Sequence, residues 1–484
     1  MFDIRYSGAG APAYHPRILL KLLVMGVLDR VRSSRRLARN ARENVVYMYL
    51  GEKLSPDFRT ISDFRKNNPT IVKEVFKHTV TLARNEGLLD LSALSTDGTK
   101  IRAQAADKHT LTKKELNFLL NFVDEELKIW NKQDTLEDNA FDSLRGTDQL
   151  PGKSRKKIKS AVKHYINQYQ KKGEPFIVEV KKKLGKSQKE AETENLEKVS
   201  TTDPEARFMK CEKGRLRLAY NCQTTVDKKG YILTADVVKD QSDNNQLKTQ
   251  LAQTKENLRV VPKGVKWFFD NGYISGENLK TLEKEKIDGY IPDQKKKHKP
   301  YDKRNFTYHP QKDIYICPLN QELPLLHSVH EYGIPVKNYE GINCHSCTSQ
   351  QQCTQARTGL RRIKRRPHEQ LLQSMRQKMD TPQAKKYYQL RKQTVEPAFG
   401  NLKQNQNLRT FHTRGLKTVR TEYQLACAAA NLAKIHRRRN QRKNEQSTEI
   451  QRISKNQPNN QTLPNPHTTQ KPIIRQAVQG GVIY

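Results

Sequence analysis

The sequence predicts a mixed α/β protein whose sheet-forming part follows an all-helical N-terminal segment. Three observations predict this class. Short segments with helix-start residues fill the first 88 positions, and alternating or apolar runs typical of strands recur between residues 91 and 292. The third observation is that two long polar stretches interrupt the strand-forming part, as insertions do.

Residues 1–88 are expected to be helical. Pro16 opens an apolar helix in its first turn, Ser33 and Ser34 can cap the next helix, and Pro69 begins a longer one. Short basic helices of this kind are typical of helix-turn-helix-like modules on DNA. A plain helical packing or dimerisation domain remains the alternative.

The strand-forming part has the order strand, insert, strand, strand, helix, strand, helix, strand. Its candidate strands are residues 91–101, 216–227, 231–238, 265–270 and 287–292, and its candidate helices are residues 244–258 and 276–286. A Lys-Lys-Gly spacing joins the second and third strands as a hairpin. This order predicts a mixed β-sheet with helices packed against it.

Composition changes mark three predicted domains. A helical N-terminal domain of the DNA-binding type occupies 1–88, a catalytic-type domain 89–435, and a disordered basic tail 436–484. Within the second domain we expect a helical insert over about 105–200, with a solvated Lys-rich end and no core, and a basic cysteine-bearing insert over about 295–381. Residues 383–406 and 415–435 are expected to be helices, the last one buried.

The charge of the chain predicts its partner. Lys plus Arg number 89 against 51 Asp plus Glu, which gives a net charge of +38. Such an excess favours a polyanion, and therefore nucleic acid, over a membrane surface, because the charge is spread over many segments. No run of about 18 apolar residues is present, which excludes a spanning helix, and the first residues lack the pattern of a signal peptide. We expect a cytoplasmic protein.

Four of the seven cysteines are clustered. Cys344 and Cys347 have the C-x2-C spacing, Cys353 follows them, and Cys317 lies upstream. Four thiolates are a ligand set for structural zinc, and a chain without a signal peptide favours metal ligands over disulfides. Free thiols in a loop are the alternative, with His345 as a bystander or substitute ligand.

Three acids are the candidate catalytic residues. Asp97 lies in or just after the first strand, Asp270 ends an apolar strand, and Glu396 belongs to a helical segment. Carboxylates brought together repel each other unless cations neutralise them, and Mg²⁺ prefers oxygen ligands. Taken singly, Asp97-Gly98 and Asp270-Asn-Gly are ordinary turn sequences, and Glu396 before Pro397 suits a helix start.

The order of short motifs resembles that of DDE transposases of bacterial insertion sequences, in the branch with a cysteine-bearing insertion. The matching segments are STDGTKI (95–101), TDPEAR (202–207), AYNCQ (219–223), AD (235–236), DNGY (270–273) and TVEPAFG (394–400), followed by Phe411, Arg414, Gly415, Lys417 and Glu422. Residues 14–17 and 32–36 resemble the first domain of that branch. The similarity covers roughly residues 10–435, and relatives often carry more chain before Tyr14, which leaves a shortened N-terminus open.

The resemblance implies an RNase H-like catalytic core in which Asp97, Asp270 and Glu396 are the two aspartates and the glutamate. It implies two Mg²⁺ or Mn²⁺ ions at these acids, and cleavage and strand transfer at the ends of an insertion sequence. The expected partners are double-stranded DNA, as terminal inverted repeats and as target, and a second copy of the chain in a dimer on paired ends. The expected location is the bacterial nucleoid.

Related transposases carry a Tyr-x2-Arg-x3-Glu-x6-Lys signature around the glutamate. Here four residues separate Arg391 from Glu396, so either the spacing is one longer or Lys392 takes the basic role. The expected phosphate-binding residues are Tyr388, Arg391, Lys392 and Lys403. Solvated helix charge is the alternative for each basic residue.

Three other functions remain open from sequence. A metal-dependent nuclease on the same fold would cut without joining. A decayed or co-opted copy would bind DNA without catalysis. A structural or RNA-binding basic protein would not require the three acids to converge.

Overall fold

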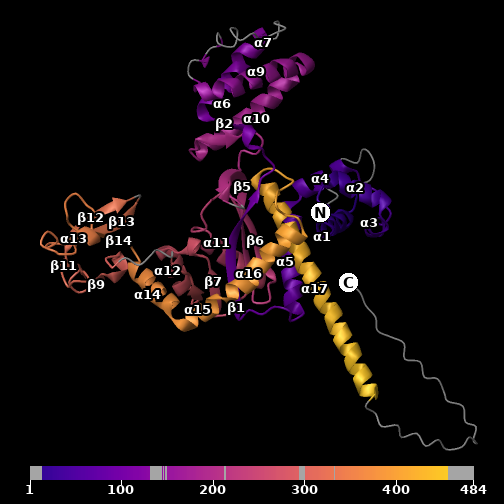
Figure 1. Ribbon diagram of the computed structural model, residues 1–484. Helices are drawn as coiled ribbons and strands as arrows, with labels where there is room; N and C mark the ends of the chain where they lie inside the picture. Colours follow the sequence, from indigo (N-terminus) through magenta and orange to yellow (C-terminus); the bar gives the residue numbers. More distant parts are fainter. Residues whose placement is uncertain are drawn as a thin grey trace, which may run out of the picture. The chain divides into compact units, whose positions relative to one another are not determined.

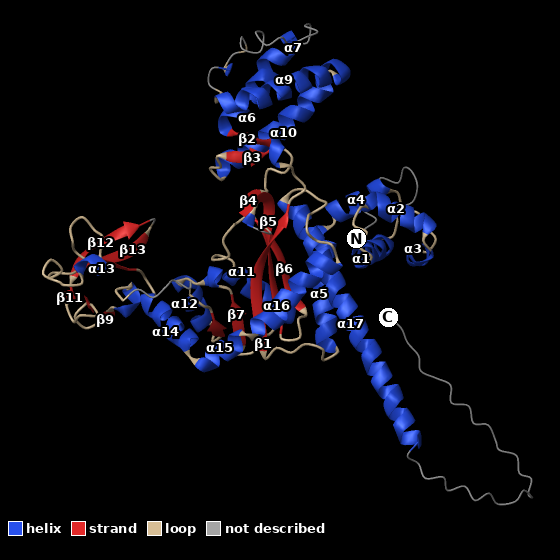
Figure 2. Ribbon diagram, in the orientation of Figure 1, coloured by secondary structure: helices blue, strands red, loops and turns tan. Residues whose placement is uncertain are grey.

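The computed structural model describes residues 14–130, 144, 146–147, 150–211, 214–293, 300–331 and 333–455 (Figure 1). The chain divides into two compact units, residues 1–435 and 436–484. Figure 2 distinguishes the helices and strands of these units. The boundary predicted at residue 88 lies inside the first unit and stays a prediction.

Five helices form the N-terminal part. They are α1 (Pro16–Leu28), α2 (Ser34–Glu43), α3 (Val45–Leu50), α4 (Phe58–Asn67) and α5 (Pro69–Asn85). Pro16 and Pro69 occupy the first helical turn, as predicted, because proline lacks the N–H that would be unpaired there. Helix α4 begins after Pro56, where the Asp57 carboxylate accepts the N–H of Thr60 at 3.0 Å.

The central sheet is mixed, as the sequence predicted. Its strands are β1 (Ala93–Arg102), β4 (Arg207–Lys210), β5 (Leu216–Asp227), β6 (Ile232–Val238), β7 (Lys266–Phe269) and β8 (Asp288–Tyr290). The order is β4-β5-β1-β7-β8, and β6 also pairs with β5. Strand β5 runs antiparallel to β1 and β6. Strand β7 runs parallel to its two neighbours β1 and β8.

Helices cover both faces of this sheet. On one face, Ser95 of β1 bonds to Thr394 of α16 (Leu390–Gly400) at 2.7 Å, and Thr224 of β5 bonds to Tyr423 of α17 (Leu416–Lys455). On the other face, Thr225 donates to Gln250 of α11 (Leu247–Leu258) at 3.4 Å. Alternate residues of each strand therefore belong to opposite layers.

The first insert is helical, as expected, but it builds a core of its own. Its elements are β2 (Thr110–Thr112), α6 (Lys113–Asn121), a π-helical turn (Phe122–Glu126), α7 (Leu127–Trp130), α9 (Gly152–Lys172), α10 (Glu174–Thr193) and β3 (Lys198–Ser200). Leu119, Ile158, Val162 and Leu184 are buried in one cluster there. The prediction of a coreless insert was wrong, because helical spacing lines up apolar rows even where lysine dominates the composition.

The cysteine-bearing insert contains short strands that the sequence did not predict. They are β9 (Thr307–His309), β10 (Ile314–Ile316), β11 (Glu322–Leu323), β12 (Leu325–Glu331), β13 (Ile334–Glu340) and β14 (Arg362–Arg365), with a one-turn helix α13 (Gln350–Cys353). They form two three-stranded sheets. Tyr315 and Tyr339 pack edge to face between them, with ring centroids 5.0 Å apart.

The remaining helices flank the central sheet. They are α12 (Gly276–Lys284), α14 (Glu369–Asp380) and α15 (Pro382–Tyr388). Helix α17 continues to Lys455, so residues 436–455 are helical and not disordered as predicted. Arg, Lys, Gln and Glu have good helix propensity, which accounts for this extension. Residues 456–484 of the predicted tail lie outside the described residues.

A buried ion pair joins the N-terminal helices to α17. The Glu422 carboxylate binds the Arg32 guanidinium and accepts the backbone N–H of Thr413 at 3.0 Å. The side chains of Arg32 and Glu422 are only 5% and 4% exposed. Burial raises the pKa of Glu422, but Arg32, Arg65 and these hydrogen bonds outweigh it and lower that pKa overall.

We predict that Glu422→Ala destabilises the protein by about 3–5 kcal/mol, because it leaves a buried arginine without its counter-ion. The measurement is the urea midpoint, followed by tryptophan fluorescence. Glu256→Ala is the control: Glu256 pairs with Lys73 and Lys77 at the surface, and its loss is expected to cost about 1 kcal/mol or less. The Glu422 contribution is lost as pH falls, since its folded pKa is lowered, so wild-type and variant midpoints converge in acid. Equal midpoints at neutral pH would contradict this prediction.

Candidate active site

The two aspartates lie side by side because β1 and β7 pair in parallel. Thr96 of β1 is opposite Phe269 of β7, so Asp97 and Asp270 follow this pair on adjacent strands. Asp270 is the first residue beyond β7 and precedes a short 3₁₀ turn, Asn271–Tyr273. The predicted convergence of these two acids is therefore present.

The same face of the sheet receives helices α15 and α16. The Tyr388 hydroxyl, at the end of α15, donates to the Phe269 carbonyl at 3.0 Å. Thr394 of α16 bonds to Ser95, two residues before Asp97. These contacts hold the helix carrying Glu396 against the strand ends carrying the two aspartates.

Arg391 of α16 connects the acids. Its Nη2 lies 2.5 Å from Oδ2 of Asp97, and its Nη1 lies 4.0 Å from Oε1 of Glu396. The Asp97 side chain is 16% exposed, whereas that of Glu396 is 54% exposed. Asp97 is thus recessed, Asp270 is partly buried, and Glu396 lies toward solvent beyond the guanidinium.

Burial dominates the electrostatics of Asp97. Burial raises its pKa to about 6, Arg391 opposes this shift, and the nearby carboxylates of Asp270 and Asp243 add to it. The surroundings of this carboxyl group disfavour its charged form. Perturbed pKa values of this kind are typical of functional sites.

Asp243 is an acid of this region that the sequence analysis missed. It lies in the segment between β6 and α11, and its carboxylate accepts the side-chain amides of Asn221 and Gln223, each at 2.6 Å. The surrounding sequence is uniformly polar, so no local pattern separates Asp243 from its neighbours. Only its position beside β1 in the structure singles it out.

Carboxylate oxygens, such as those of Asp97 and Asp270, are the ligands that a hard divalent cation prefers. Within the described ranges, no group of three or more His, Cys, Asp or Glu side chains is arranged to hold a metal ion. Mg²⁺ does not require such a group, because it commonly binds one or two carboxylates and completes its shell with water and substrate phosphate. Asp97 and Asp270 provide that pair. The Nε of Arg391 is buried and has no hydrogen-bond partner.

The four residues expected to bind phosphate occupy different environments. Arg391 is buried against Asp97, while Lys392 is exposed. Lys403 lies in a π-helical turn, Asn401–Asn405, directly after α16. Tyr388 uses its hydroxyl on the backbone of β7.

The four clustered cysteines converge, and all seven cysteines are free of disulfides. Cys317, Cys344, Cys347 and Cys353 line one small cavity of about 30 Å³. The Cys317 sulfur accepts the backbone N–H groups of Leu319 and Gln321, both at 3.3 Å. A Cβ on Gly341 would lie 2.5 Å from the Cys344 sulfur. Four thiols are a usual donor set of structural zinc, but as the structure describes them no three of these side chains are arranged to hold a metal ion.

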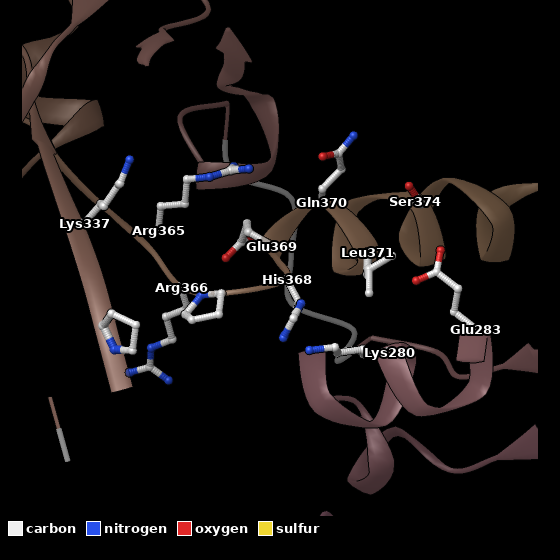
Figure 3. Close-up of a pocket in the computed structure, with 12 residues that line it drawn as sticks. Lys280, Glu283, Lys337, Arg365, Arg366, His368, Glu369, Gln370, Leu371 and Ser374 are labelled. Atoms are coloured by element: carbon white, nitrogen blue, oxygen red, sulfur yellow. The ribbon is translucent and has the colours of Figure 1, made fainter. Parts of the chain in front are cut away.

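A separate hollow of about 780 Å³ lies between α12, α14 and the strands β13 and β14. Figure 3 shows Lys280, Arg366 and His368 among its lining residues. Arg366 lies 3.6 Å from Glu331, and His368 lies 3.2 Å from Glu277. Carboxylates therefore offset much of its positive charge, and it contains none of the candidate catalytic acids.

Comparison with known families links both ends of the chain to transposition. A family described as "Transposase domain (DUF772)" matches residues 1–67, and one described as "Transposase DDE domain" matches residues 316–436. The second match contains Glu396 and the clustered cysteines, whereas Asp97 and Asp270 lie before it. No curated protein matches the chain. None of the described helices is long and apolar enough to cross a membrane.

The two family matches indicate a transposase, and the fold around the paired acids is mixed α/β. These matches support a DDE transposase of the insertion-sequence type, and a transposase DDE domain implies an RNase H-like core.

We predict that Asp97→Asn stabilises the cation-free protein at pH 7 by on the order of 1–2 kcal/mol. The folded pKa of about 6 exceeds the value of 3.8 for an ordinary aspartate, so the native state binds the proton more tightly. The free energy of unfolding therefore falls as pH rises through this window, and asparagine removes that loss.

The measurement is the urea midpoint in the presence of a chelator, at pH 4.5 and pH 7. Asp240→Asn, which removes an exposed charge from the segment after β6, is the control and should match wild type. A variant less stable than wild type at pH 7 would show that the Arg391 ion pair outweighs burial.

Proposed function

We propose that this chain catalyses metal-dependent DNA cleavage and strand transfer at the ends of its insertion sequence. The observation that carries the proposal is the parallel pairing of β1 and β7, which places Asp97 and Asp270 together on the face covered by α16. A recessed carboxylate pair under a basic helix suits phosphodiester chemistry. In this proposal the protein acts on double-stranded DNA in the bacterial cytoplasm and nucleoid.

Asp97, Asp270 and Glu396 would hold two Mg²⁺ or Mn²⁺ ions, which supply activation of the attacking oxygen and stabilisation of the leaving oxygen when bound. Arg391 lies between Asp97 and Glu396. The exposed amine of Lys392 and the amine of Lys403 would contact the DNA backbone beside the site.

The reaction proposed has two displacements at phosphorus. In the first, water attacks the phosphodiester at the element end, and the bond to the 3′ oxygen breaks to leave a 3′-hydroxyl. In the second, that hydroxyl attacks a target phosphodiester, so one phosphodiester bond forms as another breaks. The same acids serve both steps, and a dimer of the chain would hold the two ends.

The N-terminal helices are proposed to recognise the terminal inverted repeats. The ten-residue helix α2 carries four arginines, all exposed and available to phosphates: Arg35, Arg36, Arg39 and Arg42. The match of residues 1–67 to a transposase domain supports this assignment.

We expect Asp97→Ala and Asp270→Ala to lower cleavage of a labelled duplex carrying the terminal inverted repeat by at least about a hundredfold. DNA binding should stay within about threefold of wild type, because phosphate contacts and not the acids carry affinity. Cleavage with Mg²⁺ and gel-shift binding are the two measurements, and Asp240→Ala is the matched control. Product analysis with a target duplex separates joining from cutting alone.

Binding without cleavage by wild type would favour a decayed or co-opted copy. Cutting without joined products would favour the nuclease. Undiminished cutting by the aspartate variants would show that the acids are misassigned.

We also propose that Cys317, Cys344, Cys347 and Cys353 bind one structural Zn²⁺. Purified protein should contain about one zinc per chain, and Cys344→Ser should lose most of it. Cys211→Ser, outside the cluster, should retain zinc. Elemental analysis after exhaustive dialysis is the measurement, and equal zinc in wild type and the Cys344 variant would contradict the assignment.

A further inference from the structure

Asp243 approaches the acid pair from the opposite face of the sheet. Asp97 points toward α16, so the next residue, Gly98, would direct a side chain toward the other face. A Cβ on Gly98 would lie 2.4 Å from Oδ1 of Asp243 and 2.4 Å from Nε2 of Gln223. The glycine that follows Asp97 therefore leaves the space that the Asp243 carboxylate and its amide partner occupy.

The Asp243 carboxylate also lies near the turn after Asp270. A Cβ on Gly272 would lie 3.4 Å from its Oδ2, and the neighbouring Tyr273 hydroxyl donates to the Oε1 of Gln223. Gln223 in turn donates from Nε2 to Asp243 at 2.6 Å. One carboxylate thus connects the strand of Asp97, the central strand β5 and the turn of Asp270.

Among the described residues, Lys100 is the counter-ion of Asp243. Lys100 of β1 places its Nζ 3.3 Å from Oδ1 of Asp243, and the two side chains are 19% and 16% exposed. The pair is close to neutral as a unit. Removing either partner therefore leaves a net charge of known sign close to Asp97 and Asp270.

We propose that Asp243 is a positioning residue of the acid pair. It sets the strand end of Asp97 and the turn of Asp270 relative to each other, and together with Lys100 it tunes the electrostatic attraction that a divalent cation meets there. This inference rests on the proposed function, because it concerns the same acids.

The experiment measures terbium binding to the full-length, DNA-free chain by tryptophan-sensitised luminescence. Trp267 is suited to this measurement: it lies three residues before Asp270, and its indole donates to Thr96, next to Asp97, at 2.7 Å. Competition with Mg²⁺ and Mn²⁺ then gives the affinities for these ions.

Asp243→Asn should weaken terbium binding by about five- to tenfold, because it removes a negative charge near the pair. Lys100→Met should have the opposite effect and strengthen binding by about two- to fivefold. A residue that only supports folding cannot improve binding when its partner is removed. Asp240→Asn is the charge-matched control on the same segment and should match wild type.

The outcomes separate the two proposals. Terbium binding that Asp97→Asn weakens strongly, but that Asp243→Asn and Lys100→Met leave within about twofold, overturns the role of Asp243 and leaves the proposed function standing. Terbium binding that Asp97→Asn does not weaken overturns the acid site and with it this inference. If Asp243→Asn fails to fold by circular dichroism, Lys100→Met decides, and unchanged or weaker binding by that variant overturns the proposal.

Discussion

The parallel pairing of β1 and β7 is the constraint on which the rest of the candidate site depends. The two strands run in the same direction in the middle of the sheet, and their pairing ends at Thr96 and Phe269, so the next residue of each chain segment lies beside the other. Asp97 and Asp270 are about 170 positions apart in the chain, yet this pairing makes them neighbours. A slip of one residue in β1 would turn Asp97 to the opposite face and away from α16.

Burying an acid at this edge requires compensation. Burial raises the pKa of Asp97 to about 6, although the Arg391 guanidinium opposes this shift. Arg391 is itself recessed and comes from the same helix as Glu396, so one helix delivers both the cation and the third acid. Lys100 and Asp243 form the corresponding pair behind the sheet. The acids are thus held between two basic groups on opposite faces.

The sequence predicts the strands of the sheet well because each is a buried or alternating run between clear turn signals. Residues 216–227 and 231–238 were predicted as a hairpin and form β5 and β6. The strand that contains Asp97 and the strand that Asp270 follows could be predicted for the same reason. Asp243 could not, because its role comes from contacts across β1 and β5 that no local pattern encodes.

Two other parts show where local patterns fail. The strands of the cysteine-bearing insert are two to seven residues long, and runs this short give no clear apolar alternation. The first insert was interpreted as coreless from its lysine content, although its apolar residues recur at helical spacing. Its buried cluster shows that this periodicity predicts packing better than composition does.

The contacts of the α1–α2 corner connect the N-terminal helices to the turn that follows the Glu396 helix. Arg30 donates to the Asn405 carbonyl at 2.7 Å, and Arg32 donates to the carbonyls of Asn407 and Thr410 at 2.9 and 3.0 Å. Arg32 then continues to Glu422 in α17. Backbone carbonyls fix the path of the chain more strictly than side chains do, so the position of the N-terminal helices and the course of the chain after α16 are not independent. If these helices recognise the element ends, as we propose, the same arginines that hold them in place also hold the segment leading out of the catalytic helix.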